Sequence, residues 1–161
     1  MLDKTQKVLV IGSEGYVGSV LIPSLKHGNY DVFTQDVLWF GAMSSSTSNL
    51  HAGPNEHINK DLRDISAIDL EGFDSVIILS AVSNDPMGQQ FEDVTFEINR
   101  NATVRVASFA KDAGVKNFVF ASSCSVYGIA DDSPRKEGDE LNPLTAYAKS
   151  KADVELGIMS L

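Results

Sequence analysis

Short apolar runs rich in β-branched residues alternate with longer segments of helical spacing along this chain. Such runs predict buried parallel strands, and the segments between them predict helices. The predicted strands are residues 7–11, 31–35, 57–59, 75–79 and 117–121. The predicted helices are residues 16–27, a short helix following 61–64, residues 91–113 and a final helix from about residue 144. Polar stretches at 41–56 and 83–90 predict loops.

This alternation predicts an α/β fold with helices on both faces of a parallel sheet. Right-handed crossovers favour a doubly wound, Rossmann-type sheet with strand order 3-2-1-4-5. In such a sheet, ligands bind beyond the carboxyl ends of the strands, near the switch between the first and fourth strands. The first helix is expected to turn Val17, Val20, Leu21 and Leu25 towards the sheet.

A glycine triplet, Gly12-x-x-Gly15-x-x-Gly18, follows the first strand directly and opens the first helix. In that context, Gly12 permits a tight turn, Gly15 lets backbone amides approach a pyrophosphate, and Gly18 lets the helix pack closely on the strand. The helix N-terminus then faces the phosphates of a dinucleotide. The alternative is a glycine-rich turn without a ligand.

Two aspartates follow strands of the predicted sheet. Asp36 ends the second strand, where a carboxylate can accept both ribose hydroxyls of an adenosine and would repel a 2′-phosphate. It therefore favours NAD over NADP, although it could instead only cap a strand. Asp61, after the third strand, could accept from the adenine amino group, but such a residue is more often a helix cap.

Tyr147 and Lys151 lie four residues apart on the final helix and so share one face. A nearby ammonium favours the phenolate, so Tyr147 could exchange a proton with a substrate hydroxyl. Ser123 ends the fifth strand at the same rim and could hold the substrate oxygen, whereas Ser122 is expected to bond only to backbone. Asn99 either stiffens the site through a backbone carbonyl or water, or is an ordinary buried polar residue.

Composition narrows the class of protein. The 161 residues suit one domain, and the net charge of −9 argues against nucleic-acid and membrane-surface partners. The single Cys124 forms no internal disulfide, and the three histidines have no metal-ligand spacing, so no metal site is expected. A polar N-terminus and one cysteine favour the cytoplasm.

Four segments resemble the extended short-chain dehydrogenase/reductases, and among them the nucleotide-sugar epimerases of the UDP-galactose 4-epimerase type. The segments occur in the order of that family and run the length of the chain. They are residues 8–18 (VLVIGSEGYVG), 61–64 (DLRD), 114–128 (GVKNFVFASSCSVYG) and 147–151 (YAKSK).

The resemblance implies an enzyme that uses NAD and acts on a nucleotide sugar, with the hydride moving at a sugar carbinol. It implies a catalytic set of Ser123, Tyr147 and Lys151. It implies NAD contacts from Gly12, Gly15, Tyr16, Val17, Gly18, Asp36, Asp61, Leu62, Asn99, Tyr147 and Lys151. It also implies a homodimer formed through the helix at 94–113 and the Tyr147 helix. On the Tyr147 helix, Ala148, Ala152 and Leu156 form an apolar stripe at a spacing of four, and the alternative is that this stripe packs inside the monomer.

The chain departs from the family's pattern in two respects. The sugar-nucleotide 4,6-dehydratases carry Asp-Glu after the catalytic Ser or Thr, where this chain has Cys124 and Ser125, so an epimerase or a 4-keto-sugar reductase is expected. The family's nucleotide-sugar lobe would follow residue 161, so residues 1–161 are expected to be the NAD-binding domain with the catalytic helix. The alternative is a cofactor-binding protein or subunit without turnover.

Overall fold

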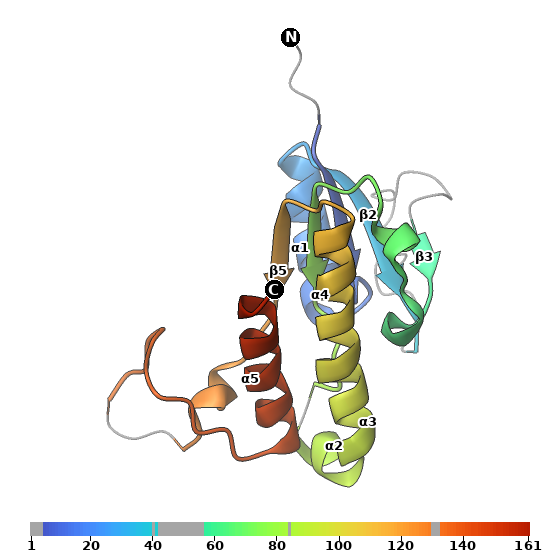
Figure 1. Ribbon diagram of the computed structural model, residues 1–161. Coiled ribbons are helices and arrows are strands. Elements are labelled where there is room, and N and C mark those ends of the chain that lie inside the picture. The colour runs from blue at the N-terminus through green and yellow to red at the C-terminus, as the bar shows by residue number, and fades with distance from the viewer. Residues whose placement is uncertain (1–4, 40, 42–56, 84, 130–132) are drawn as a thin grey trace. The chain divides into compact units, whose positions relative to one another are not determined.

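The computed structural model describes residues 5–39, 41, 57–83, 85–129 and 133–161 (Figure 1). These residues form two compact units, one made of the chain up to Ser80 together with 106–121, the other of 81–105 and 122–161. Apart from Gly41, the predicted loop 41–56 lies outside the described residues. No helix among the described residues is both long enough and apolar enough to span a bilayer.

The first unit is built on a parallel sheet of five strands in the order β3-β2-β1-β4-β5, which confirms the predicted topology. Strands β1 and β4 lie next to each other in the centre of the sheet. Both of their faces are covered, so their sequences are mostly apolar. Leu9 is paired with Val76 and Ile11 with Ile78, and all four are almost fully buried. The strands are β1 (Lys7–Ile11), β2 (Asp31–Asp36), β3 (His57–Asn59), β4 (Ser75–Ile78) and β5 (Asn117–Phe120).

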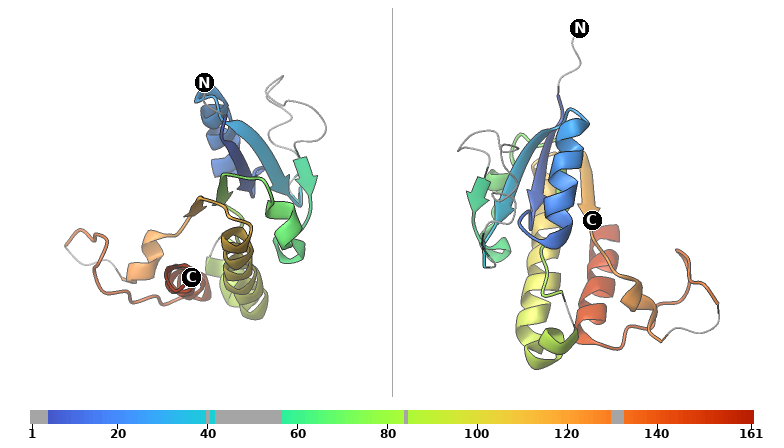
Figure 2. Two further views of the ribbon diagram at one scale, coloured as in Figure 1. Left: turned by 45° about the horizontal axis from the view of Figure 1, so that its top comes forward. Right: turned by 180° about the vertical axis from the view of Figure 1, so that it is seen from behind.

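Helix α1 (Tyr16–His27) covers one face of this sheet, and residues 106–112 of α4 (Thr103–Asp112) cover the other (Figures 1 and 2). Ile22 of α1 packs with Val8, Val10 and Val32, and Leu25 joins the same cluster. Two short 3₁₀ helices complete the unit, η2 (Leu62–Asp64) and η3 (Ala67–Leu70).

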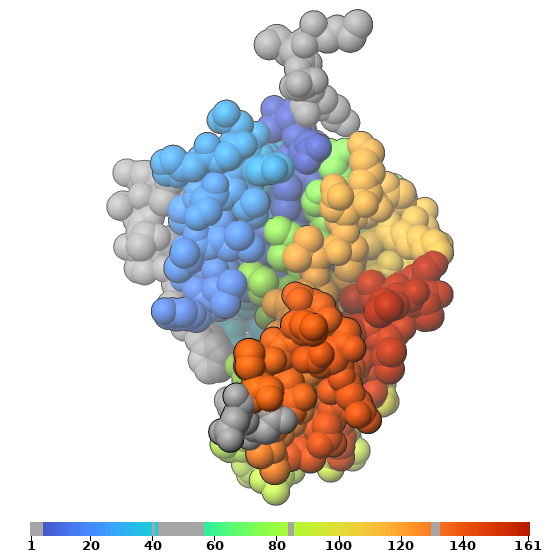
Figure 3. Space-filling model, turned by 90° about the vertical axis from the view of Figure 1, so that its left-hand side faces the viewer, coloured from blue at the N-terminus to red at the C-terminus, as the bar shows by residue number. Residues whose placement is uncertain are grey.

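The predicted inward face of α1 is wrong in part. Val17 and Val20 are 56% and 64% exposed, and Figure 3 shows the outer surface of this helix in blue. The helix instead turns Gly18 and Ile22 to the sheet, and both are buried. The close approach at Gly18 sets this rotation, because positions 18, 22 and 25 share one helical face.

The second unit contains helices α2 (Asp85–Gln90), α3 (Glu92–Thr95) and α5 (Ala146–Met159), with a 3₁₀ helix η5 (Cys124–Tyr127). Residues 85–90 are helical rather than the predicted loop. The predicted helix 91–113 is interrupted by a π-helical segment, η4 (Phe96–Ala102), between α3 and α4. Such segments are rare and occur often at functional sites.

Candidate functional site

The predicted cofactor residues Gly12–Gly18, Asp36, Asp61 and Leu62 belong to the first unit, while Asn99, Ser123, Tyr147 and Lys151 belong to the second. In the first unit, the turn after β1 is bound to the end of β2. The backbone amides of Gly12 and Ser13 both donate to the carbonyl oxygen of Gln35, at 2.8 and 3.2 Å. Gln35 was not among the predicted site residues, because the acceptor is its backbone carbonyl, which every residue carries.

Two of the three glycines are required by the fold itself. Gly12 has a φ of +84°, and a Cβ there would lie 2.4 Å from the amide nitrogen of Ser80. A Cβ at Gly18 would lie 2.2 Å from the carbonyl oxygen of Ser13. These contacts confirm the tight turn at Gly12 and show that Gly18 brings α1 close to the backbone of the turn after β1.

Gly15 differs from the other two glycines, because the fold alone does not require it. It is exposed, its φ is −78°, and a Cβ would meet only the carbonyl oxygen of Gly12, at 3.5 Å. As the N-cap of α1 it offers no side chain to the amides of Tyr16, Val17 and Gly18. A helix leaves those first amides without an intrahelical partner, so they suit an anion. The turn therefore fits the pyrophosphate of a dinucleotide.

Asp36 is held against the glycine turn. One carboxylate oxygen accepts the amide of Glu14 at 2.9 Å, and the other accepts the amide of Leu38 at 2.9 Å. An ionised carboxylate has about four acceptor positions, so two bonds leave capacity for ribose hydroxyls. Glu14 itself is buried at 6% exposure, a position that the sequence analysis did not single out.

Asp61 is a helix cap in this structure. Its carboxylate accepts the backbone amide of Arg63 and two guanidinium nitrogens of the same residue, at 2.8 to 2.9 Å. The side-chain hydrogen bond from Arg63 holds the pKa of Asp61 below its ordinary value. Leu62 is buried beside it and starts η2. Asp61 therefore has the contacts of a capping residue, which is the alternative that the sequence left open.

In the second unit, Lys151 lies beside Tyr147 as the four-residue spacing predicted. Its Nζ lies 5.7 Å from the centre of the Tyr147 ring, and the lysine is only 3% exposed. Burial disfavours the charged ammonium and lowers the pKa of Lys151 to about 8. The side chain therefore remains mostly protonated at neutral pH, and it places a positive charge beside the phenol.

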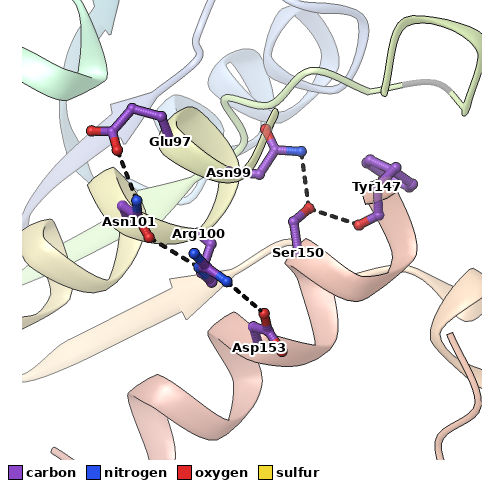
Figure 4. Close-up of polar contacts among 7 residues, drawn as sticks. All are labelled: Glu97, Asn99, Arg100, Asn101, Tyr147, Ser150 and Asp153. Carbon is purple, nitrogen blue, oxygen red and sulfur yellow. Dashed lines mark hydrogen bonds and ion pairs between the residues drawn. The ribbon is translucent and has the colours of Figure 1, made fainter. Parts of the chain in front are cut away.

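Asn99 joins the backbone after β4 to the start of α5. Its Oδ1 accepts the amide of Val82 at 2.8 Å, and its Nδ2 donates to the carbonyl of Val82 at 3.0 Å and to Oγ of Ser150 at 3.2 Å (Figure 4). It bonds a backbone carbonyl, one of the roles that the sequence allowed. Ser150 was missed, because a serine in the middle of a helix carries no motif of its own.

Ser123 caps η5, and its hydroxyl is engaged by a second serine. Its Oγ lies 2.8 Å from Oγ of Ser125 and accepts the Ser125 amide at 3.2 Å. Ser122, which was expected to bond backbone, instead donates to the carboxylate of Glu155. The position that carries a glutamate in 4,6-dehydratases therefore holds a hydroxyl that contacts Ser123.

Residues 8–158 match the NAD dependent epimerase/dehydratase family, and the chain belongs to that family. It is 33% identical to a UDP-glucose 4-epimerase of Lactobacillus helveticus over 92% of this chain and 45% of that protein. The chain spans about half the length of the proteins that it matches. NAD, the cofactor predicted from the sequence, is the cofactor of this family.

The solved structures that share the fold include an epimerase and a dehydratase. One is a UDP-N-acetylglucosamine 4-epimerase from Methanobrevibacter ruminantium in complex with UDP-N-acetylmuramic acid, with a TM-score of 0.86 and 28% identity over 98% of this chain and 50% of that chain. The other is a dTDP-glucose 4,6-dehydratase from Streptomyces venezuelae with NAD bound, with a TM-score of 0.83 and 29% identity over 94% of this chain and 50% of that chain.

Proposed function

We propose that this chain is the NAD-binding and proton-transferring portion of a nucleotide-sugar 4-epimerase or 4-keto-sugar reductase. The observation that carries the proposal is the buried Lys151 beside Tyr147, in a chain that also holds a glycine turn suited to a dinucleotide. A buried lysine is costly unless its charge is used, which favours a chemical role for the pair.

The cofactor residues of the first unit would each bind a different part of the dinucleotide. The amides at the start of α1 would bind the pyrophosphate, and Asp36 would accept the adenosine ribose hydroxyls. Bound NAD would supply a hydride acceptor for oxidation of a sugar carbinol, and its reduced form would supply the hydride for reduction of a keto sugar. Asp61 would accept from the adenine amino group with a carboxylate that Arg63 also contacts, and Leu62 would contact the cofactor beside it.

The residues of the second unit would handle the proton. Tyr147 would take the proton of a sugar hydroxyl, and the charge of Lys151 would stabilise the phenolate that accepts it. Ser123 would donate to the same sugar oxygen. By the resemblance, Lys151 would also bond the nicotinamide ribose.

The choice of reaction rests on the positions after Ser123. Dehydration needs an acid at the leaving hydroxyl, and Cys124 and Ser125 are not carboxylic acids. Epimerisation or keto reduction needs only hydride transfer with Tyr147 as acid and base. The alternative function is cofactor binding without turnover, in which the same chain binds NAD but does not convert a nucleotide sugar.

The test is calorimetric titration of the purified chain with NAD and with NADP. We expect tighter binding of NAD, by at least about tenfold, because Asp36 repels a 2′-phosphate. Asp36→Asn should remove most of this preference. Asp31→Asn, at the other end of the same strand, is the matched control and should keep it. Equal affinities in the unaltered chain would contradict the Asp36 assignment.

We also propose a homodimer, on a narrower surface than the sequence suggested. Ala148 and Ala152 are 1% and 5% exposed, so they pack within the chain and do not form a surface stripe. Leu156 and Met159 are 63% and 84% exposed and remain available. Sedimentation at micromolar concentration should show a dimer that Leu156→Glu dissociates, and a monomer in the unaltered chain would reject the proposal.

A further inference from the structure

The first turns of α5 are tied to η4 by a buried side chain outside the predicted site. Ser150 is 0% exposed. Its Oγ donates to the carbonyl oxygen of Tyr147 at 2.7 Å and accepts from Nδ2 of Asn99 at 3.2 Å. Figure 4 shows both bonds, with Ser150 between Asn99 and Tyr147.

Asn99 is itself held in place at its other end. It is 1% exposed, and both polar atoms of its amide bond the backbone of Val82. An asparagine amide has two N–H groups, so one can serve the Val82 carbonyl and the other Ser150. The chain of bonds therefore runs from the backbone at Val82, through Asn99 and Ser150, to the backbone of Tyr147.

The same two helices share a second polar contact, one turn further along α5. Arg100 donates to Asp153 at 3.2 Å, but these side chains are 40% and 43% exposed. An exposed ion pair contributes on the order of 0–1 kcal/mol and is screened by salt. The buried bonds of Ser150 work in a low dielectric and are the contact expected to fix the position of α5.

We propose that Ser150 is a positioning residue, which holds Tyr147 and its neighbour Lys151 in place by linking the Tyr147 carbonyl to Asn99. The inference rests on the proposed function for the roles of Tyr147 and Lys151. A helix without this link keeps its own backbone bonds and the exposed contact with Arg100, but it loses the buried bond between Ser150 and Asn99.

The experiment substitutes Ser150→Ala in the full chain and follows two nuclear magnetic resonance signals. One is the Asn99 side-chain amide, which loses an acceptor. The other is the Lys151 side chain across a pH titration. Because burial lowers the pKa of Lys151 to about 8, loosening this turn admits water, and we expect the midpoint to rise by about half a pH unit or more.

Two matched variants separate positioning from general loosening. Ser160→Ala removes the same kind of bond at the C-cap of α5, from a hydroxyl to the carbonyl three residues earlier, at 2.7 Å and in an exposed place. Asp153→Asn removes the exposed contact with Arg100. Neither should move either signal. Ser150→Thr keeps the hydroxyl and should keep both signals near those of the unaltered chain.

The proposal is overturned if Ser150→Ala leaves both signals in place, or if a control variant moves them as much. It is also overturned if Ser150→Thr unfolds at the same temperature as the unaltered chain but shifts both signals as much as Ser150→Ala does. These readouts need neither NAD nor turnover. A chain that fails to bind NAD would therefore contradict the proposed function while leaving the result on Ser150 intact.

Discussion

Replacing Lys151 with methionine should change how the stability of this protein depends on pH. The lysine is 3% exposed, and burial lowers its pKa from 10.5 to about 8 in the folded chain. Methionine keeps an unbranched side chain of similar reach but carries no charge. The substitution therefore removes the titratable amino group, and the methionine side chain fills most of the space that the lysine occupied.

The sign follows from proton binding in the two states. Between about pH 8 and pH 10.5 the unfolded lysine stays protonated while the folded one loses its proton. Stability rises with pH where the unfolded state binds more protons, so burial of Lys151 costs most below pH 8 and progressively less above it. One pKa unit corresponds to about 1.4 kcal/mol, so the cost is roughly 3 kcal/mol at neutral pH and falls by about 2 kcal/mol by about pH 9.5.

The assay is urea unfolding of both proteins at several pH values in that interval. The stability of Lys151→Met relative to the unaltered chain should be highest at about pH 7 and should decline by about 2 kcal/mol at about pH 9.5. Lys149→Met, which alters an exposed lysine on the same helix, is the control and should run parallel to the unaltered chain. A difference between Lys151→Met and the unaltered chain that stays constant with pH would refute the reasoning.

Three further predictions concern the glycine turn and turnover. Gly18→Ala should lower the free energy of unfolding by about 3 kcal/mol or more, because its Cβ would lie 2.2 Å from a backbone oxygen. Gly15→Ala should leave stability within about 1 kcal/mol yet weaken NAD binding at least tenfold, since its Cβ enters only the space beside the helix N-terminus; thermal unfolding and calorimetry on the same samples separate the two effects, and the reverse pattern would contradict both assignments. Incubated with NAD and a panel of UDP-, GDP- and TDP-sugars, this chain alone should yield no product at an enzymatic rate, because remote binding energy must position the sugar. Product that disappears in Tyr147→Phe would disprove that expectation and still assign the proton transfer to α5.

The order of the sheet could be read from the chain. Apolar runs such as residues 7–11 and 75–79 can be buried only in central strands, and crossover handedness then leaves few arrangements. The glycine triplet was informative because its roles are local: a positive φ at Gly12 and a close backbone approach at Gly18 are demands of the turn itself. Tyr147 and Lys151 are likewise related by helical spacing alone.

Other features depended on contacts between distant segments. The exposed face of α1 could not be predicted, because the helix is rotated by the approach of Gly18 to Ser13 and not by its apolar residues. The partners of Asn99 could not be predicted for the same reason, because Val82 and Ser150 lie 17 and 51 residues away along the chain.

The sequence by itself therefore determined the strands, their order, the glycine turn and the pairing of Tyr147 with Lys151, since each follows from local spacing or from the period of burial. Only the tertiary structure decided that Ala148 and Ala152 are interior and that Ser150 joins Asn99 to Tyr147. Hydrogen bonds and burial depend on which groups meet in space, and for these residues the partner lies on another element or in a local geometry that spacing does not specify.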